Sequence, residues 1–144
     1  MLYYLSLGSN IGEREQMLRE AVRLIEQQIG NILRCSSFYY SEPWGFDSKH
    51  EFCNLCCALK TAKSPLEVLH LTQAIERQLG RTKKSVNGHY ADRTMDIDLI
   101  RTFDDEGKEI IINFQFSNFS LILPHPLWQQ RDFVRIPLQE IFLS

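Results

Sequence analysis

The chain has 144 residues, of which 44% are hydrophobic and 24% are charged, and its formal net charge is −2. This composition is close to the average of globular proteins, and the length suits one domain with its own core, which we expect to cover residues 1–144. The small net charge argues against nucleic acid or a membrane surface as a partner. We see no signal peptide and no apolar run near the roughly 20 residues that span a bilayer, so we expect a cytoplasmic protein.

Strands and helices alternate in the first half of the predicted structure. The first helix has apolar residues at helical spacing, with Asn10 as its N-cap and Glu13 three residues later. The second helix begins at Ser64, which forms a capping box with Glu67 and is followed by Pro65 at the first helical position. In chain order, the expected elements are a strand at 1–7, a helix ending at Gly30, a strand at 32–40, a loop at 42–50, a strand at 52–59 and a helix ending at Gly80.

The second half is expected to complete an antiparallel sheet. Residues 81–93 show no apolar periodicity, which indicates a functional or mobile loop. After this loop we expect a strand at 94–102, a turn at 104–107, a returning strand at 109–116, a Pro-rich loop, a short helix near 127–131 and a last short strand at 134–138. The order β-α-β-β-α-β with a C-terminal extension predicts a ferredoxin-like α+β fold, in which an antiparallel sheet carries helices on one face.

Four cysteines raise the question of a metal or redox site. The spacing of Cys53 and Cys56 is that of a Cys-x-x-Cys motif, but no second pair of ligands lies near it in the sequence. On a strand, two residues three positions apart point to opposite faces. We therefore expect ordinary reduced cysteines that pack in the core.

Two aspartates in the strand at 94–102 give the sharpest chemical signal. Because side chains alternate along a strand, Asp96 and Asp98 point to one face, and Met95, Ile97 and Leu99 point to the other. The two aspartate Cα atoms are then roughly 6.5–7 Å apart, close enough for their carboxylates to share a cation. Mg²⁺ prefers such hard oxygen ligands, so the pair suggests a metal site; a solvent-exposed strand with two aspartates is the alternative.

The loop before this strand is locally basic, which suits phosphate oxygens, although a solvated run of charges would look the same. Its basic residues are Arg81, Lys83, Lys84, His89 and Arg93. An acidic pair beside a basic loop suggests that the protein binds a Mg-nucleotide. The sequence contains no GxxxxGK[ST] or GxGxxG motif, which argues against a P-loop enzyme and a Rossmann dinucleotide site.

Aromatic and amide side chains indicate a pocket for a flat ring. Phe52 and Asn54 share one face of the strand at 52–59, Trp44 precedes them in a loop, and Phe133 lies near the C-terminus. Two rings can enclose a planar heterocycle, and an amide can pair with its hydrogen-bonding edge. For each aromatic residue, a place in the core is the competing interpretation.

Several short motifs follow one another along nearly the whole chain. They are Leu7-Gly8-Ser9-Asn10, Ser37-Phe38-Tyr39, Glu42-Pro43-Trp44-Gly45, Phe52-Cys53-Asn54, Gln73 with Glu76, Gly80-Arg81, Arg93-Thr94-Met95-Asp96-Ile97-Asp98, Pro124-His125-Pro126, Arg131-x-Phe133 and Pro137-Leu138-x-Glu140-Ile141. In this order they resemble the 6-hydroxymethyl-7,8-dihydropterin pyrophosphokinase family, which acts in folate biosynthesis.

The resemblance implies ATP and 6-hydroxymethyl-7,8-dihydropterin as substrates, release of AMP, and two Mg²⁺ ions held by Asp96 and Asp98. We also expect a monomer. The catalytic residues would be Arg81, Lys83, Arg93, Asp96 and Asp98. ATP would contact Gln73, Glu76, His125, Arg131 and the backbone of Leu99 and Ile100. Gln73 and Glu76 share a helix face, and their spacing alone suggests that this face is exposed. The pterin would lie between Phe52 and Phe133, and Asn54 and the loop with Glu42, Pro43 and Trp44 would read its edge.

The chain departs from the family pattern just before the two aspartates. His89 and Tyr90 stand where many members have arginine and tryptophan, and the loop is one residue longer. Phe52 stands where a tyrosine is common, which keeps the ring and loses a hydroxyl. Two alternatives to an active kinase therefore stay open: a family member that binds pterin without turnover, and a non-enzymatic ferredoxin-like module that binds a small ligand.

Overall fold

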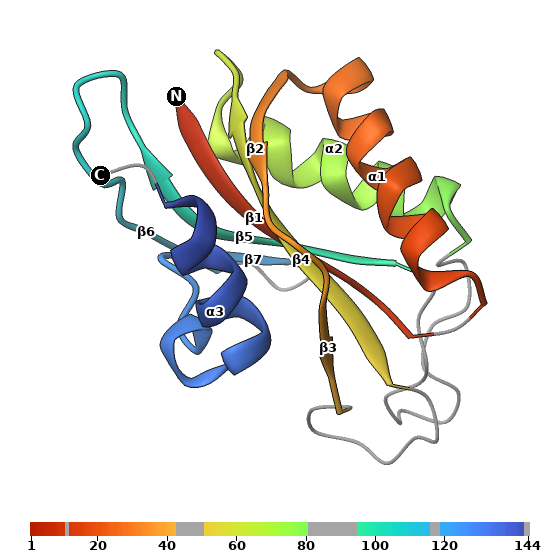
Figure 1. Ribbon diagram of the computed structural model, residues 1–144. Helices are drawn as coiled ribbons and strands as arrows, with labels where there is room; N and C mark the ends of the chain where they lie inside the picture. Colours follow the sequence, from red (N-terminus) through yellow and green to blue (C-terminus); the bar gives the residue numbers. More distant parts are fainter. Residues whose placement is uncertain (11, 43–50, 81–94, 116–118, 143–144) are drawn as a thin grey trace.

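The computed structural model in Figure 1 describes residues 1–10, 12–42, 51–80, 95–115 and 119–142. Its elements, in chain order, are β1 (Leu2–Ser9), α1 (Arg14–Gln28), β2 (Asn31–Cys35), β3 (Tyr39–Ser41), β4 (Phe52–Lys60), α2 (Pro65–Gln78), β5 (Asp96–Phe103), β6 (Ile112–Gln115), β7 (Ser120–Leu123), the 3-10 turn η2 (Trp128–Gln130) and α3 (Asp132–Ile141). None of the helices in the described part of the chain is long and apolar enough to cross a membrane.

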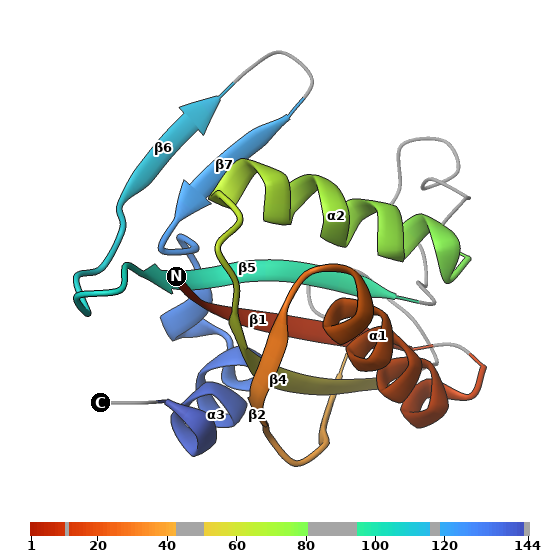
Figure 2. The ribbon, with the colours of Figure 1, turned by 90° about the horizontal axis from the view of Figure 1, so that it is seen from above.

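An antiparallel sheet forms the centre of the structure. Its strand order is β2-β4-β1-β5, and β3 also pairs with β4 beyond the end of β2. Helices α1 and α2 cover one face, and α3 covers the other, as Figure 2 shows from above. The prediction of an α+β fold with an antiparallel sheet is confirmed, and the C-terminal extension adds a helix on the second face.

The central strand β1 is buried on both faces because it contributes to two hydrophobic clusters. Tyr3, Leu5 and Leu7 belong to the larger cluster beneath α1 and α2. Tyr4 belongs to the smaller cluster beneath α3, together with Val134 of that helix. Alternation along one strand therefore builds both layers of the core.

The two predicted helix starts had different outcomes. The capping box of α2 is confirmed: the Glu67 N–H donates to the Ser64 Oγ at 3.3 Å, and the Ser64 N–H donates to the Glu67 Oε1 at 3.2 Å. The prediction that Asn10 caps the first helix is wrong, because α1 begins at Arg14 with Glu13 at its N-cap and no side-chain capping bond. Asn10 is instead buried at the end of β1.

The C-terminal strand predicted at 134–138 is wrong, since these residues lie in α3. Val134, Leu138 and Ile141 recur at helical spacing and are all buried in the cluster beneath this helix. Pro137 lies inside the helix and lacks the N–H that would complete a backbone bond. Burial of the apolar face outweighs that loss. The proline made the segment look unlike a helix in the sequence.

Two other strand predictions need correction. The strand predicted at 32–40 is split into β2 and β3, and between them the Ser36 Oγ accepts from the Cys56 N–H at 2.9 Å. Where the structure describes it, the segment predicted to return from β5 as a hairpin makes one isolated bridge, between Phe103 and Glu109, next to a hydrogen bond from the Ile110 N–H to the Thr102 carbonyl. Its later residues form β6, which pairs with β7 because Leu121 and Leu123 anchor β7 in the core.

Candidate functional site

Pairing among β5, β1 and β4 brings the predicted site residues into two adjacent rows. Asp96 is opposite Gly8, which is opposite Asn54 on the other side. In the next row, Asp98 is opposite Ser6. Direct neighbours in a sheet project to the same face. The two aspartates and Asn54 therefore share the face of the sheet that α3 covers further along, and the predicted common direction of Asp96 and Asp98 is confirmed.

Gly8 forms the floor between the aspartates and Asn54. A Cβ atom at this position would lie 3.0 Å from the Asn54 Oδ1 and 3.5 Å from the Phe52 Cδ1. Those distances are tight or ordinary contacts, so the Asn54 and Phe52 side chains lean over the space that a larger residue at position 8 would fill. The close approach of Asn54 thus explains on steric grounds why a glycine suits this position of the Leu7-Gly8-Ser9-Asn10 motif.

The Asn54 amide is fixed by β3. Its Nδ2 donates to the Tyr39 carbonyl at 2.9 Å and to the Ser41 Oγ at 2.8 Å. Both amide hydrogens are used by these bonds, and the Oδ1 is left on the side of Gly8. Asn54 is 3% exposed, so it presents a single acceptor oxygen from an otherwise buried side chain.

His125 and Arg131 reach the same region from the segment that precedes α3. The His125 N–H donates to the Ile100 carbonyl at 2.8 Å, and the His125 Nδ1 accepts from the Leu127 N–H at 3.2 Å. Burial lowers the pKa of His125, the positive charge of Arg131 lowers it further, and the Asp96 carboxylate acts in the opposite direction. A neutral imidazole that accepts at Nδ1 carries its proton at Nε2, so His125 is a donor at its outer nitrogen.

Phe133 lies two residues beyond Arg131, in the first turn of α3. The Arg131 guanidinium carbon is 5.9 Å from the centre of the Phe133 ring. This contact joins the predicted cation for phosphate to one of the two rings predicted to enclose the pterin. Phe52, the other ring, is half-buried on β4.

Helix α2 contributes to the outer edge of β5. The Glu76 Oε2 accepts from the Ile97 N–H at 2.7 Å, and Glu76 is buried, whereas the helical spacing alone suggested an exposed face. Gln73, one turn earlier, is half-buried. The side chains of Leu99 and Ile100 lie in the two hydrophobic clusters, so only their backbone is available to a ligand.

A β-bulge in β5 could not be predicted from the sequence. Leu5 is opposite Leu99 and Tyr4 is opposite Arg101, so Ile100 is an extra residue on this strand. The bulge reverses the alternation, and Arg101 therefore projects to the same face as Asp98. It also exposes the Ile100 carbonyl to the His125 N–H.

Some predicted residues lie outside the described part of the chain. They are Pro43, Trp44, Arg81, Lys83, Lys84, His89, Tyr90 and Arg93. Glu42, at the edge of that part, is exposed. Tyr39 and Ser41 orient Asn54; Tyr39 belongs to the Ser37-Phe38-Tyr39 motif without an assigned role, and Ser41 was not singled out, its only signal being its place just before the Glu42 loop.

The chemistry available in the described residues is that of oxygen ligands and cations rather than thiols. Among them, no group of three or more His, Cys, Asp or Glu side chains is placed to hold a metal ion. The four cysteines are free, and Cys53, Cys56 and Cys57 are buried while Cys35 is exposed. Burial raises the pKa of Cys53 to about 11, which makes it a poor nucleophile.

The chain has recognisable relatives. Residues 4–143 match the family described as 7,8-dihydro-6-hydroxymethylpterin-pyrophosphokinase. A 2-amino-4-hydroxy-6-hydroxymethyldihydropteridine pyrophosphokinase of Porphyromonas gingivalis is 44% identical over 140 residues, which cover 97% of this chain and 90% of the relative. The protein of the same name from Bacillus subtilis (strain 168) is 40% identical over 139 residues, covering 96% and 76%.

Solved structures show the same fold in a larger context. A structure described as HPPK-DHPS in complex with substrates superposes with a TM-score of 0.68 at 15% sequence identity. The match covers 97% of this chain and 40% of that chain, so the domain spans less than half of the solved protein. At this identity, the likeness concerns the fold alone.

Proposed function

The chain belongs to the 7,8-dihydro-6-hydroxymethylpterin-pyrophosphokinase family, and from this premise we propose that it transfers the pyrophosphoryl group of ATP to the hydroxymethyl group of 6-hydroxymethyl-7,8-dihydropterin in folate biosynthesis, releasing AMP. The observation that carries the proposal is the row Asp96, Gly8 and Asn54, which aligns the predicted metal ligands with the predicted pterin ligand across neighbouring strands. A module that only binds a ligand would not require this combination.

Asp96 and Asp98 would hold Mg²⁺ in this proposal. Their carboxylates share one face and are half-buried beside a residue without a side chain, and oxygen ligands of this kind suit a hard divalent cation. When bound, Mg²⁺ neutralises phosphate charge and orients the pyrophosphoryl group. The two aspartates form one side of the site, so cations from the protein are needed on the other side of the phosphates.

His125 and Arg131 are placed to supply part of that charge balance. Arg131 carries a permanent positive charge, and His125, a neutral donor, lies within electrostatic reach of both Arg131 and Asp96. We propose that they contact the triphosphate and neutralise charge that develops on it during transfer. Arg81, Lys83 and Arg93 stay predicted contributors to the same task.

The pterin would bind at the Asn54 end of the row. The Asn54 Oδ1 is an acceptor, so it would receive an N–H group from the edge of the heterocycle. Phe52 and Phe133 would enclose the ring from two sides, and Gly8 leaves space beneath it. This arrangement would point the hydroxymethyl group toward the aspartates.

The remaining expectations are compatible with this assignment. The order β2-β4-β1-β5, with α1 and α2 on one face, is what a ferredoxin-like arrangement requires, and we infer that topology for the chain. We also infer a monomer that acts in the cytoplasm.

The proposal is tested by product analysis. Purified protein is incubated with ATP, the hydroxymethyl pterin and Mg²⁺, and adenine nucleotides are separated by chromatography. We expect AMP and the pterin diphosphate in equal amounts, and no AMP when pterin or Mg²⁺ is omitted. Formation of ADP would contradict the proposal, and pterin binding without AMP would identify a family member that lacks turnover.

A further inference from the structure

We propose that Glu76 is a positioning residue that holds the edge of β5 so that Asp96 and Asp98 stay side by side; this inference rests on the proposed function, which gives the two aspartates their role. β5 is the terminal strand in the order β2-β4-β1-β5, so N–H groups on its outer side need acceptors from outside the sheet. The Ile97 N–H, between the two aspartates, donates to the Glu76 Oε2.

The nature of the acceptor shows that this edge is held firmly. The N···O distance is 2.7 Å, which is short for a backbone N–H and typical of a bond to a charged acceptor. Glu76 is 6% exposed, and burial of a carboxylate costs several kcal/mol unless strong hydrogen bonds offset it. A mobile water molecule could satisfy an N–H on an edge strand, so a buried side-chain acceptor on α2 suggests a need for rigidity at this position.

The anchor acts from the face opposite to the aspartates. Glu76 is on α2, which covers the larger hydrophobic cluster, whereas Asp96 and Asp98 share the face covered by α3. On the inner side of β5, the same two aspartates are paired with Gly8 and Ser6 of β1. The segment from Asp96 to Asp98 is thus fixed along both of its edges, and Glu76 acts on the cation site through the backbone rather than through contact with substrate.

The role differs from the one that the family resemblance implies, in which Glu76 lines the nucleotide site. A residue that contacts ATP should affect the KM for ATP first. A residue that aligns the aspartates should affect the affinity for the divalent cation and kcat together, because both depend on the geometry of the carboxylates.

Three variants separate these roles. Glu76→Gln keeps an acceptor oxygen and loses the charge, Glu76→Leu keeps the volume and loses the acceptor, and Thr72→Val is the control. Thr72 is also buried on α2, one turn before Glu76, but its hydroxyl donates to the Leu69 carbonyl of its own helix at 2.9 Å. Its replacement tests whether any loss of a buried polar group in this helix disturbs the site.

The measurements are amide hydrogen exchange of Ile97 by NMR, calorimetric affinity for Mn²⁺ in the presence of a non-hydrolysable ATP analogue, and kcat with Mg²⁺. We expect Glu76→Leu to accelerate Ile97 exchange, weaken Mn²⁺ binding about tenfold and lower kcat about tenfold, as loss of one buried hydrogen bond predicts. For Glu76→Gln, the Ile97 exchange rate, the Mn²⁺ affinity and kcat should each stay within about threefold of the wild type. Thr72→Val should equal the wild type in all three quantities.

The inference is overturned if Glu76→Leu leaves Ile97 exchange or Mn²⁺ affinity unchanged, or if it raises only the KM for ATP. It is also overturned if Glu76→Gln loses as much as Glu76→Leu, because the charge rather than the hydrogen bond would then matter. If Glu76→Leu does not fold, Glu76→Met serves in its place. A wild-type protein that forms no AMP would refute the proposed function alone, since exchange and Mn²⁺ binding need no turnover.

Discussion

The two ends of β5 carry side chains of opposite charge on the same face of the sheet, two aspartates at one end and Arg101 at the other. At one end, Asp96 and Asp98 are half-buried and lie opposite Gly8 and Ser6 of β1. At the other end, the Arg101 Nε and Nη2 each donate to a Glu109 carboxylate oxygen at 2.8 Å. At the first end, a glycine lies opposite Asp96, and at the second end the arginine and the glutamate form an ion pair.

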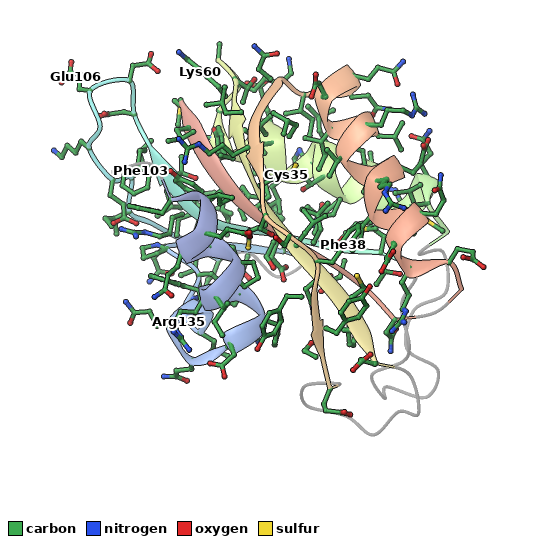
Figure 3. All side chains as sticks on the ribbon, in the orientation of Figure 1. Cys35, Phe38, Lys60, Phe103, Glu106 and Arg135 are labelled. Atoms are coloured by element: carbon green, nitrogen blue, oxygen red, sulfur yellow. The ribbon has the colours of Figure 1, made fainter. Side chains whose placement is uncertain are left out.

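Aromatic rings surround Arg101 at the second end. The Arg101 guanidinium carbon lies 5.1 Å from the ring centre of Phe103, 5.3 Å from that of Trp128 and 4.8 Å from that of Phe142. Figure 3 shows Phe103 beside α3, away from Phe38. A cavity of about 600 Å³ adjoins this cluster and is lined by Arg101, Trp128 and Phe142, so the space at this end is remote from the aspartates. The comparison predicts that one end governs turnover and the other governs stability.

Replacement of Asp98 gives the largest expected effect on this comparison. We expect Asp98→Ala to lower kcat roughly 10²- to 10⁴-fold, because several kcal/mol of transition-state stabilisation depend on the metal that it would hold. The free energy of unfolding should change little, since the side chain is half-buried and β5 keeps its pairing with β1. The rate of AMP formation and a urea unfolding curve measure the two quantities. Unchanged turnover would show that the aspartates are not the metal ligands.

Gly8→Ala tests the floor of the site and should have an intermediate effect. The new Cβ would lie 3.0 Å from the Asn54 Oδ1, so the amide must move by a few tenths of an ångström against its bonds to Tyr39 and Ser41. We expect the KM for the pterin to rise about tenfold, the cost of one weakened hydrogen bond, while the KM for ATP stays within about twofold. Steady-state kinetics with each substrate varied in turn would measure both constants, and an equal rise in both would contradict a role confined to the pterin.

The sequence predicted the aspartate end of β5 better than the arginine end. Strict alternation from Met95 to Leu99 is enough to place Asp96 and Asp98 on one face, and the structure agrees. Beyond Ile100 the bulge reverses this alternation, so no rule of period two could place Arg101 on the same face. Its pairing with Glu109 depends on tertiary contacts.

The same limit applies to the candidate site itself. The residue types of Phe52, Asn54 and Asp98 follow from strand patterns and from the family motifs. The direction of the Asn54 amide could not be predicted from these patterns. It depends on β3, a strand of three residues that was predicted as one strand with β2. The buried position of Glu76 also needed the structure, since helical spacing alone placed it on an exposed face.

Arg101→Ala is the counterpart of Asp98→Ala and should affect stability alone. Loss of the Glu109 pair and of three cation–π contacts should destabilise the fold by about 1–3 kcal/mol. For a chain of this length, that corresponds to a fall in Tm of about 3–10 °C. Calorimetry measures the Tm, and kcat at a temperature well below it should equal that of the wild type. Arg135→Ala is a matched control, because Arg135 pairs with Asp132 on the surface of α3 at 2.8 Å and contributes little.

If kcat falls with Arg101→Ala while Arg135→Ala is normal, the two ends of β5 are coupled and their separation fails. The bulge at Ile100 is the physical route by which this could happen, because its carbonyl binds the His125 N–H.

The smallest expected effect is the pH dependence of the structural end. Hydrogen bonds and the charge of Arg101 hold the pKa of Glu109 below its usual value. The folded protein therefore binds fewer protons at this carboxylate than the unfolded chain, so the stabilisation is present above the ordinary glutamate pKa and disappears as the pH falls through the lowered one. In urea titrations, stability should decline less between pH 7 and acid in Glu109→Gln than in the wild type. Turnover should be equal in the two proteins near neutral pH, because Glu109 and Arg101 lie outside the proposed substrate site. Parallel stability curves would mean that Glu109 titrates alike in the folded and unfolded states, and that the ion pair with Arg101 contributes packing rather than charge.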